Sequence, residues 1–290
     1  MEKQEYLQER VDAHVHLWNP ERFRLPWLDE EPALNQPFEL PEYPQEGTGS
    51  TVTGMVFVEG DVAPHYAFLE AKWATGLAAY DRRLNGIVAA APVEHGNTIR
   101  SYLTALQSLG PLIKGVRRNL QGETDPAFCV QPEFVRGVQL VGEYGLSFDL
   151  CLRQHQLPMA VELVRQCPDT RFMLDHLGKP AIKDHALDPW RDHLAQLAAL
   201  PNVWCKLSGL VTEADWQHWT PDDLAPYVTY ALERFGEDRV VFGSDWPVIL
   251  LASSFDRWVE TLDALTQHLS TEAKRKLWAE NARHFYRLPA

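Results

Sequence analysis

The sequence predicts an α/β fold, a (β/α)8 TIM barrel, from three observations. Short apolar runs rich in β-branched residues alternate with longer segments of helical spacing, which is typical of parallel strands joined by helices. Eight such runs occur within 290 residues, close to the ~250 residues typical of a closed barrel. Polar side chains gather where the runs end, and barrel enzymes place their active sites at the carboxyl ends of the strands.

The predicted strands follow one another along the chain with helical segments between them. They are residues 10–17, 53–60, 85–93, 112–120, 146–153, 171–178, 202–209 and 239–247. A doubly wound open sheet is the alternative, but it usually carries a G-x-G-x-x-G motif after an early strand. The sequence has no such motif, so the closed barrel is favoured.

Local signals mark the ends of three predicted helices. Pro64 suits a first helical turn, where a missing N–H costs nothing. Gly145 closes the helix after the fourth strand, because glycine readily adopts the left-handed conformation that follows many helices. Ser270 or Thr271 is the expected N-cap of the last helix.

The connection at residues 19–51 is long and rich in proline. Long loops within compact domains often act as lids, so we expect this one to fold over the barrel mouth. A surface loop without a function is the alternative for any single residue in it. With 45% hydrophobic residues, the chain can bury one large core, and we expect a single domain over residues 1–290.

The composition excludes several classes of function. A net charge of −13 without a lysine- or arginine-rich run argues against nucleic acid and anionic membrane surfaces as partners. The charged N-terminus lacks the apolar region of a signal peptide, and no apolar stretch reaches the length of a membrane span. The four scattered cysteines indicate reduced thiols. We therefore expect a cytoplasmic protein that acts on a small molecule.

The first strand carries the most informative pattern. Asp12, His14 and His16 alternate with apolar residues and would share one face of a strand. Burying three polar groups costs several kcal/mol unless each has a hydrogen-bond partner. This face is therefore either a functional site or a set of core residues that are hydrogen-bonded to their neighbours. Polar residues at the ends of the other strands favour the site. They are Glu59, Lys114, Arg117, Arg118, Asn119, Arg153, His155, Asp175, His176, Lys206, Ser208 and Asp245.

Some of these residues also have a structural explanation. Asp175 directly precedes His176 and is expected to face the helices, in a structural hydrogen bond. Only one of Arg117 and Arg118 can point inward, and Arg117 is favoured. His155 is either part of the site or a histidine of the loop.

Six segments resemble the amidohydrolase superfamily, and more narrowly its branch of sugar lactonases that includes L-fuconolactonase-like and L-rhamnonolactonase-like proteins. 2-Pyrone-4,6-dicarboxylate lactonase is a more distant relative. The segments are DAHVHLW, GVRRNLQ, FDLCLRQHQL, LDHLGKP, KLSGLVTEADW and FGSDWPV. The resemblance runs from about Val11 to the closing ENARHFYRL and implies an amidohydrolase-type barrel.

The resemblance also implies a metal site. In metal-bearing relatives, residues at the positions of His14, His16 and Asp245 bind a divalent ion, with those of His155 and His176 nearby. The carboxylated lysine that bridges two metals in some relatives has no match here, so at most one ion, with zinc as the candidate, is expected. Some lactonases of this branch work without a metal, and these residues also suit acid–base chemistry.

The implied reaction is hydrolysis of a sugar-acid lactone, such as L-fucono- or L-rhamnonolactone. Asp245 would activate water, and His176, Arg117 or a metal would polarise the carbonyl. Other residues would bind substrate. They are Trp27, Glu59, Lys114, Arg153, His155, Ser208 and Trp246. The alternative is a metal-dependent decarboxylase or hydratase that acts on an aromatic or small carboxylic acid.

Overall fold

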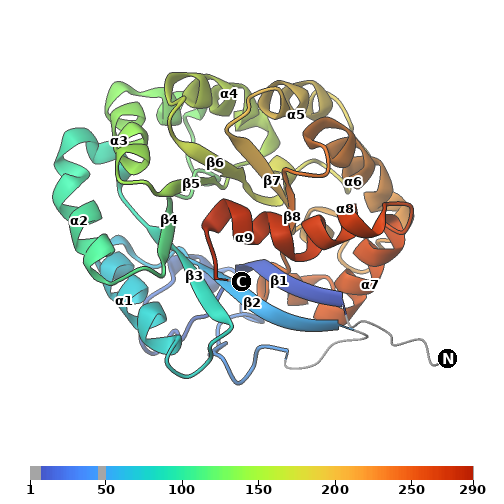
Figure 1. The fold of residues 1–290 in the computed structure, drawn as a ribbon, viewed down its shortest axis with the longest axis horizontal. Coiled ribbons are helices and arrows are strands. Elements are labelled where there is room, and N and C mark those ends of the chain that lie inside the picture. The colour runs from blue at the N-terminus through green and yellow to red at the C-terminus, as the bar shows by residue number, and fades with distance from the viewer. Residues whose placement is uncertain (1–7, 45–49, 290) are drawn as a thin grey trace.

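The computed structural model describes residues 8–44 and 50–289, and its strands form a nearly closed barrel. Each strand pairs in parallel with the next in chain order, and the helices surround the barrel (Figure 1). The strands are β1 (Gln8–Val15), β2 (Ser50–Val58), β3 (Leu84–Ala90), β4 (Ile113–Arg117), β5 (Ser147–Leu150), β6 (Arg171–Leu174), β7 (Val203–Leu207) and β8 (Val240–Phe242). The predicted TIM barrel is confirmed.

Most of the helices cover the outer face of the sheet (Figure 1). The described helices are α1 (Ala67–Leu77), α2 (Arg100–Ser108), α3 (Pro132–Glu143), α4 (Leu157–Gln166), α5 (Trp190–Ala198), α6 (Pro221–Phe235), α7 (Phe255–Leu265), α8 (Thr271–Arg275) and α9 (Asn281–Tyr286). Gly145 follows α3 with a φ of 68°, as predicted. Ser270 is the N-cap of α8, since its hydroxyl accepts from the Ala273 N–H at 3.1 Å. Pro64 opens a short 3-10 turn ahead of α1 rather than α1 itself.

The barrel closes where the residues after β8 meet the end of β1. The Asp245 N–H donates to the His14 carbonyl at 2.9 Å, and the His16 N–H donates to the Trp246 carbonyl at 2.7 Å. These bonds bring the two ends of the sheet together. Two segments more than two hundred residues apart are thereby joined at the barrel mouth.

The apolar core lies in two layers separated by the sheet. Along β2, Val56 and Val58 point into the barrel, while Met55 and Phe57 pack on the surrounding helices. At the amino ends of the strands, α9 lies across the barrel, where Phe285 packs in the interior cluster (Figure 1). The opposite end remains available for a site.

A bulge in β1 changes the face that Asp12 occupies. Asp12 pairs with Met55 and Val15 pairs with Phe57, so three steps on β1 match two on β2. The extra residue turns Asp12 outward, while His14 points into the barrel. The expectation that Asp12 shares a face with the two histidines is therefore wrong.

Asp12 instead stabilises the contact that closes the barrel. One carboxylate oxygen accepts from the Ser244 N–H at 2.8 Å, and the other accepts from the Tyr43 hydroxyl at 2.9 Å. Burial raises the pKa of Asp12 to about 6, although these hydrogen bonds oppose the shift. The aspartate thus has a structural role next to the candidate site.

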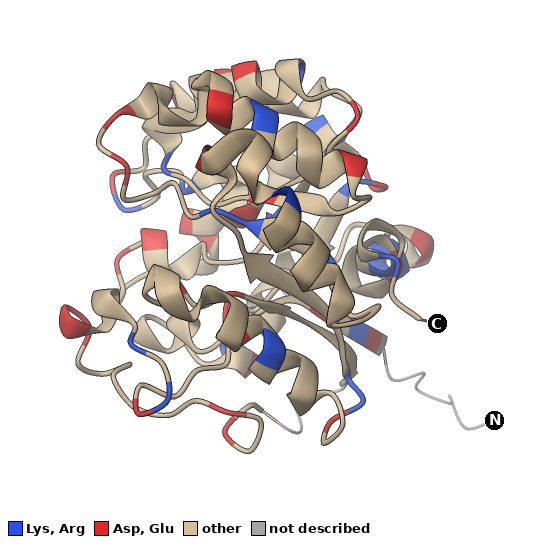
Figure 2. Ribbon diagram, turned by 90° about the vertical axis from the view of Figure 1, so that its left-hand side faces the viewer, with Lys and Arg blue, Asp and Glu red and all other residues tan. Residues whose placement is uncertain are grey.

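Charged residues of both signs are interspersed over the helices and loops of one side of the molecule (Figure 2). Across the described ranges 8–44 and 50–289, none of the helices combines the length and apolar character required to cross a bilayer.

Candidate active site and metal centre

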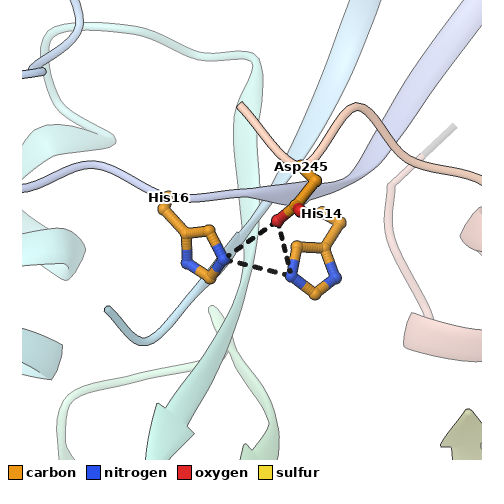
Figure 3. Close-up of side chains that lie close together, drawn as sticks. All are labelled: His14, His16 and Asp245. Carbon is orange, nitrogen blue, oxygen red and sulfur yellow. Dashed lines mark hydrogen bonds and ion pairs between the residues drawn. The ribbon is translucent and has the colours of Figure 1, made fainter. Parts of the chain in front are cut away.

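Three side chains converge at the mouth of the barrel (Figure 3). The His14 and His16 Nε2 atoms lie 3.2 Å apart. Asp245 Oδ1 lies 3.6 Å from His14 Nε2 and 3.4 Å from His16 Nε2. Zinc bonds of ~2.0–2.1 Å at tetrahedral angles place ligand atoms about 3.3 Å apart. The three atoms therefore fit one zinc-sized ion.

His176 completes the ring of side chains around Asp245. Its Nε2 lies 4.0 Å from Asp245 Oδ1, and its Nδ1 bonds the Ser208 hydroxyl at 2.9 Å. A Cβ on Gly209 would lie 2.4 Å from His176 Nδ1, so only glycine lets the ring occupy this place. Ser208 and Gly209 thus position His176.

The backbone at the site is strained. His176, Leu177 and Lys179 have φ values of 54°, 52° and 50°, and Asp245 has a φ of 62°. The left-handed region costs non-glycine residues roughly 1–2 kcal/mol each. Such strain concentrates at functional sites, where the surrounding structure holds the side chains in the required direction. Here it aims His176 and Asp245 at the same space.

Burial and charge set the protonation states at this point. Burial lowers the pKa of His176 to about 4, so its imidazole is neutral at pH 7. Burial by itself would raise the pKa of Asp245, but His176 and the histidines of β1 outweigh it and hold that pKa well below its usual value. At neutral pH the site therefore presents an ionised carboxylate beside a neutral imidazole.

Arg117 enters the site from the end of β4. Its Nε donates to Glu59 Oε1 at 2.5 Å, and its Nη2 donates to the Glu59 carbonyl at 2.6 Å. Arg118 turns away and pairs with Glu94 and Glu123. Burial disfavours the charged guanidinium, but Glu59 outweighs it and raises the pKa of Arg117.

A pocket opens above these side chains. Besides Arg117, five residues singled out in the sequence line it, namely His16, Trp27, Asn119, His176 and Asp245. Trp27 is held there by its indole N–H, which donates to the Gly60 carbonyl at 2.8 Å. Asp61 and Lys179 also line the pocket and were not predicted. Both directly follow predicted strands, which is the signal that could have identified them.

Two predicted substrate contacts lie just behind the pocket. Trp246 is only 2% exposed and packs edge-on against Phe38 and Tyr43, so its ring is not available to stack on a substrate. The Ser208 hydroxyl is fully buried against His176. In this structure neither side chain lines the pocket, and both pack behind it.

Three further predicted contacts lie away from the pocket. Lys114 is near the beginning of β4, and its Nζ donates to the Arg287 carbonyl at 3.1 Å at the opposite end of the barrel. Arg153 and His155 are exposed around the short turn before α4 and do not line the pocket. All three residues were predicted at a carboxyl end of a strand, but their side chains point away from the pocket.

A buried ionic network beneath the pocket was missed. Lys206 Nζ lies 2.7 Å from Asp149 Oδ2, 2.9 Å from Asp175 Oδ1 and 3.2 Å from His14 Nδ1. Asp175 therefore points into the barrel, and the expectation that it faces the helices is wrong. Burial raises the pKa of Asp149 to about 6, while Lys206 opposes the shift. The charged residue inside the apolar run of β7 was the available signal.

Comparisons with known proteins identify the family of this chain. The sequence profile of a family described as amidohydrolase matches residues 11–288. The chain is 31% identical to an L-fucono-1,5-lactonase of Burkholderia multivorans, with 97% of this chain and 96% of that protein covered. It is 23% identical to an L-rhamnono-gamma-lactonase of Scheffersomyces stipitis, with 96% and 98% covered.

A solved structure extends the likeness to three dimensions. A crystal structure of a Burkholderia multivorans amidohydrolase with bound zinc superimposes with a TM-score of 0.85 at 31% identity. The match covers 97% of this chain and 99% of that one. The barrel and its order of elements are therefore shared along nearly the whole chain.

Proposed function

This chain belongs to the amidohydrolase family, and from that premise we propose that it opens the ring ester of a neutral sugar lactone with water. The observation that carries the proposal is the convergence of His16, His176 and Asp245 on one pocket, with the buried His14 Nε2 3.6 Å from Asp245 Oδ1. The similarity to fucono- and rhamnonolactonases supports a sugar-acid lactone as the substrate.

Asp245 is the proposed base. Its low pKa keeps the carboxylate ionised at neutral pH, where it can take a proton from an attacking water. Its position in the pocket lets the same group return that proton to the ring oxygen as the ester bond breaks. Positioned acid–base groups of this kind commonly contribute 10²–10⁴-fold to the rate.

Arg117 and His176 are the proposed electrophiles. Arg117 is charged and lines the pocket, so its guanidinium can stabilise negative charge on the carbonyl oxygen during attack. His176 is neutral at pH 7 and presents its Nε2 on the Asp245 side, with Nδ1 held by Ser208. In the low-dielectric mouth of a barrel, such fixed donors act more strongly than they would in water.

The charges of the pocket support a neutral substrate. Arg117 is paired with Glu59, and Lys179 lies 3.4 Å from Glu213. Both cationic side chains that line the described pocket are thus matched by a carboxylate. Among the protein side chains of this pocket, a substrate carboxylate would find no unpaired cation, which favours a neutral substrate over a charged one.

One divalent ion is the proposed occupant of the centre. His14, His16 and Asp245 would hold it, because their three ligand atoms already have the spacing of a tetrahedral site. When bound, such an ion supplies Lewis-acid polarisation of the carbonyl. Zinc is the proposed metal, in keeping with the histidine and carboxylate ligands.

We propose that residues 19–51 cover the mouth of a single barrel domain. Trp27 reaches the pocket from this segment, and Phe38 pairs with Trp18 through two backbone hydrogen bonds of 2.8 Å. The part at 45–49 lies outside the described residues.

A lactone panel tests the proposed function. The 1,4- and 1,5-lactones of L-fuconic and L-rhamnonic acids would be assayed with a pH indicator, before and after chelation and zinc restoration. A carboxylated lactone such as 2-pyrone-4,6-dicarboxylate serves as the comparison. We expect turnover of neutral aldonolactones and at least about tenfold lower kcat/KM for the charged compound, since 1.4 kcal/mol of unpaired charge already produces that ratio. Preference for the charged lactone would contradict the proposal.

A further inference from the structure

The reaction pocket has a polar wall that the proposed mechanism does not use. Asp61 lies in the loop after β2, and Asn119 and Gln121 lie in the loop after β4. Asn119 is only two residues beyond Arg117, the proposed electrophile. The polar wall is therefore close to the position expected for the lactone carbonyl.

Asp61 is held in one orientation by its neighbours. Its N–H donates to Glu59 Oε2 at 2.6 Å, and its Oδ2 accepts from Asn119 Nδ2 at 3.1 Å. The backbone of Asp61 has a φ of 59°, which aspartate tolerates better than most non-glycine residues but still at a cost in free energy. Backbone strain of this kind concentrates at functional sites. The protein thus fixes the direction of this carboxylate before any ligand binds.

Asp61 and Asn119 each keep a free hydrogen-bonding group. Within the described residues, Asp61 Oδ1 accepts no hydrogen bond and the carboxylate forms no ion pair. Asn119 Oδ1 accepts from the Gln121 N–H at 3.1 Å, and only one of the two N–H groups on Asn119 Nδ2 is engaged, by Asp61. A free acceptor on Asp61 and a free donor on Asn119 therefore lie side by side.

This combination selects one kind of ligand group. An ammonium group can only donate and a carboxylate can only accept, whereas a hydroxyl group does both. Two adjacent hydroxyls can therefore donate to Asp61 Oδ1 and accept from Asn119 Nδ2 at the same time. Gln121 Oε1, which is buried without a hydrogen-bond partner in the part of the chain that the structure describes, adds another acceptor to the polar wall.

We propose that Asp61 and Asn119 bind two adjacent hydroxyl groups of the lactone ring, and that Asp61 is thereby a specificity-determining residue for polyhydroxylated lactones. The inference rests on the proposed function, because it places the ring of an ester substrate in this pocket. Sites that hydrogen-bond a substrate hydroxyl discriminate strongly against analogues that lack it, since their own polar groups are then left unpaired. Hydroxyl recognition consequently appears as a ratio between two substrates, which a general loss of structure does not change.

The test compares two lactones that differ only in their hydroxyl groups. L-fucono-1,5-lactone carries three of them, and δ-hexalactone has the same ring and methyl group without any. Values of kcat/KM would be measured for the wild type, Asp61→Gly and Asp61→Asn, with circular dichroism of each protein. Glycine removes the carboxylate without opposing the left-handed backbone, and asparagine keeps one acceptor oxygen. Arg287→Gly is the matched control, because its φ is 52° and it lies at the opposite end of the barrel.

We expect the wild type and the control to prefer L-fucono-1,5-lactone. In Asp61→Gly this preference should fall at least about tenfold, which is the factor expected for one hydrogen bond to a charged group. Asp61→Asn should lose less of it. A loss of the same factor for both lactones would overturn the inference, as would a wild-type preference for δ-hexalactone.

A binding measurement separates this inference from the proposed function. L-fucose has the same hydroxylated ring but no ester, and its binding can be followed by NMR titration. Wild-type protein that hydrolyses neither lactone would refute the proposed function. In that case, or where only one lactone is turned over, L-fucose decides: weaker binding to Asp61→Gly than to the wild type and Arg287→Gly supports hydroxyl recognition, and equal binding to all three overturns it.

Discussion

Replacing Asp245 by asparagine tests the role of the carboxylate in the reaction while leaving the fold intact. Asp245 has a φ of 62°, and asparagine tolerates this left-handed conformation better than other non-glycine residues. Alanine would add roughly 1–2 kcal/mol of backbone strain and confuse the result. The Asp245 N–H bond to the His14 carbonyl, which closes the barrel, does not involve the side chain. Asp245→Asn should therefore remain folded.

The expected loss of activity follows from the surroundings of the carboxylate. Asp245 is 4% exposed and one oxygen faces three imidazoles at 3.4 to 4.0 Å, so bulk water cannot readily replace it as proton acceptor. Loss of a general base costs 10²–10⁴-fold in rate. The lower limit corresponds to about 2.7 kcal/mol of activation free energy. We expect kcat to fall by at least about 10²-fold.

The assay is lactone turnover followed with a pH indicator on the same preparation used for circular dichroism. Asp215→Asn is the matched control, because Asp215 is an exposed aspartate that does not line this pocket. The control should keep the wild-type rate. A folded Asp245→Asn protein with near wild-type turnover would show that Asp245 is not the base.

Three further predictions follow from the described contacts. Because the pKa of His176 is about 4, kcat/KM should stay level from pH 7 to about 5 and fall below that range, where His176 becomes protonated. An inflection near pH 6.5, the ordinary pKa of histidine, would contradict the neutral imidazole assigned here. Arg117→Met leaves the buried Glu59 carboxylate without its cation and should lower the free energy of unfolding in urea by about 3–5 kcal/mol. Arg117→Met/Glu59→Gln should recover part of the loss, and equal stability of the two variants would show that the two side chains do not stabilise each other. Gly243→Ala places a Cβ 2.8 Å from the Cβ of His14, so it should lower the free energy of unfolding by about 1–3 kcal/mol and weaken zinc binding by displacing His14. Unchanged zinc affinity would show that His14 does not move.

The sequence by itself determined the barrel and the end of it that carries the site. Alternating apolar runs and helical segments specify parallel strands, and a parallel barrel places all carboxyl ends of its strands on one side. His14, His16, His176 and Asp245 could therefore be grouped although they are far apart in the chain. In the structure, the Nε2 atoms of the histidines and Oδ1 of Asp245 lie 3.2 to 4.0 Å from their neighbours in this group.

Directions of side chains were predicted less well, because a strict period of two holds only while the strand is regular. The bulge in β1 inserts one residue between Asp12 and Val15 and turns Asp12 outward. The turn after β6 leaves the strand conformation at His176, so Asp175 and His176 both reach the interior. Neither departure leaves a mark in the pattern of apolar residues.

Only the tertiary structure decided which polar residues support the site from within the barrel. Lys206 is a single charge in an apolar strand, and its partners Asp149, Asp175 and His14 come from β5, the turn after β6 and β1. A buried charge is stable only with such partners, and barrel closure determines which groups come within reach. Trp246 likewise became part of the core because Phe38 and Tyr43, from a distant loop, cover its ring.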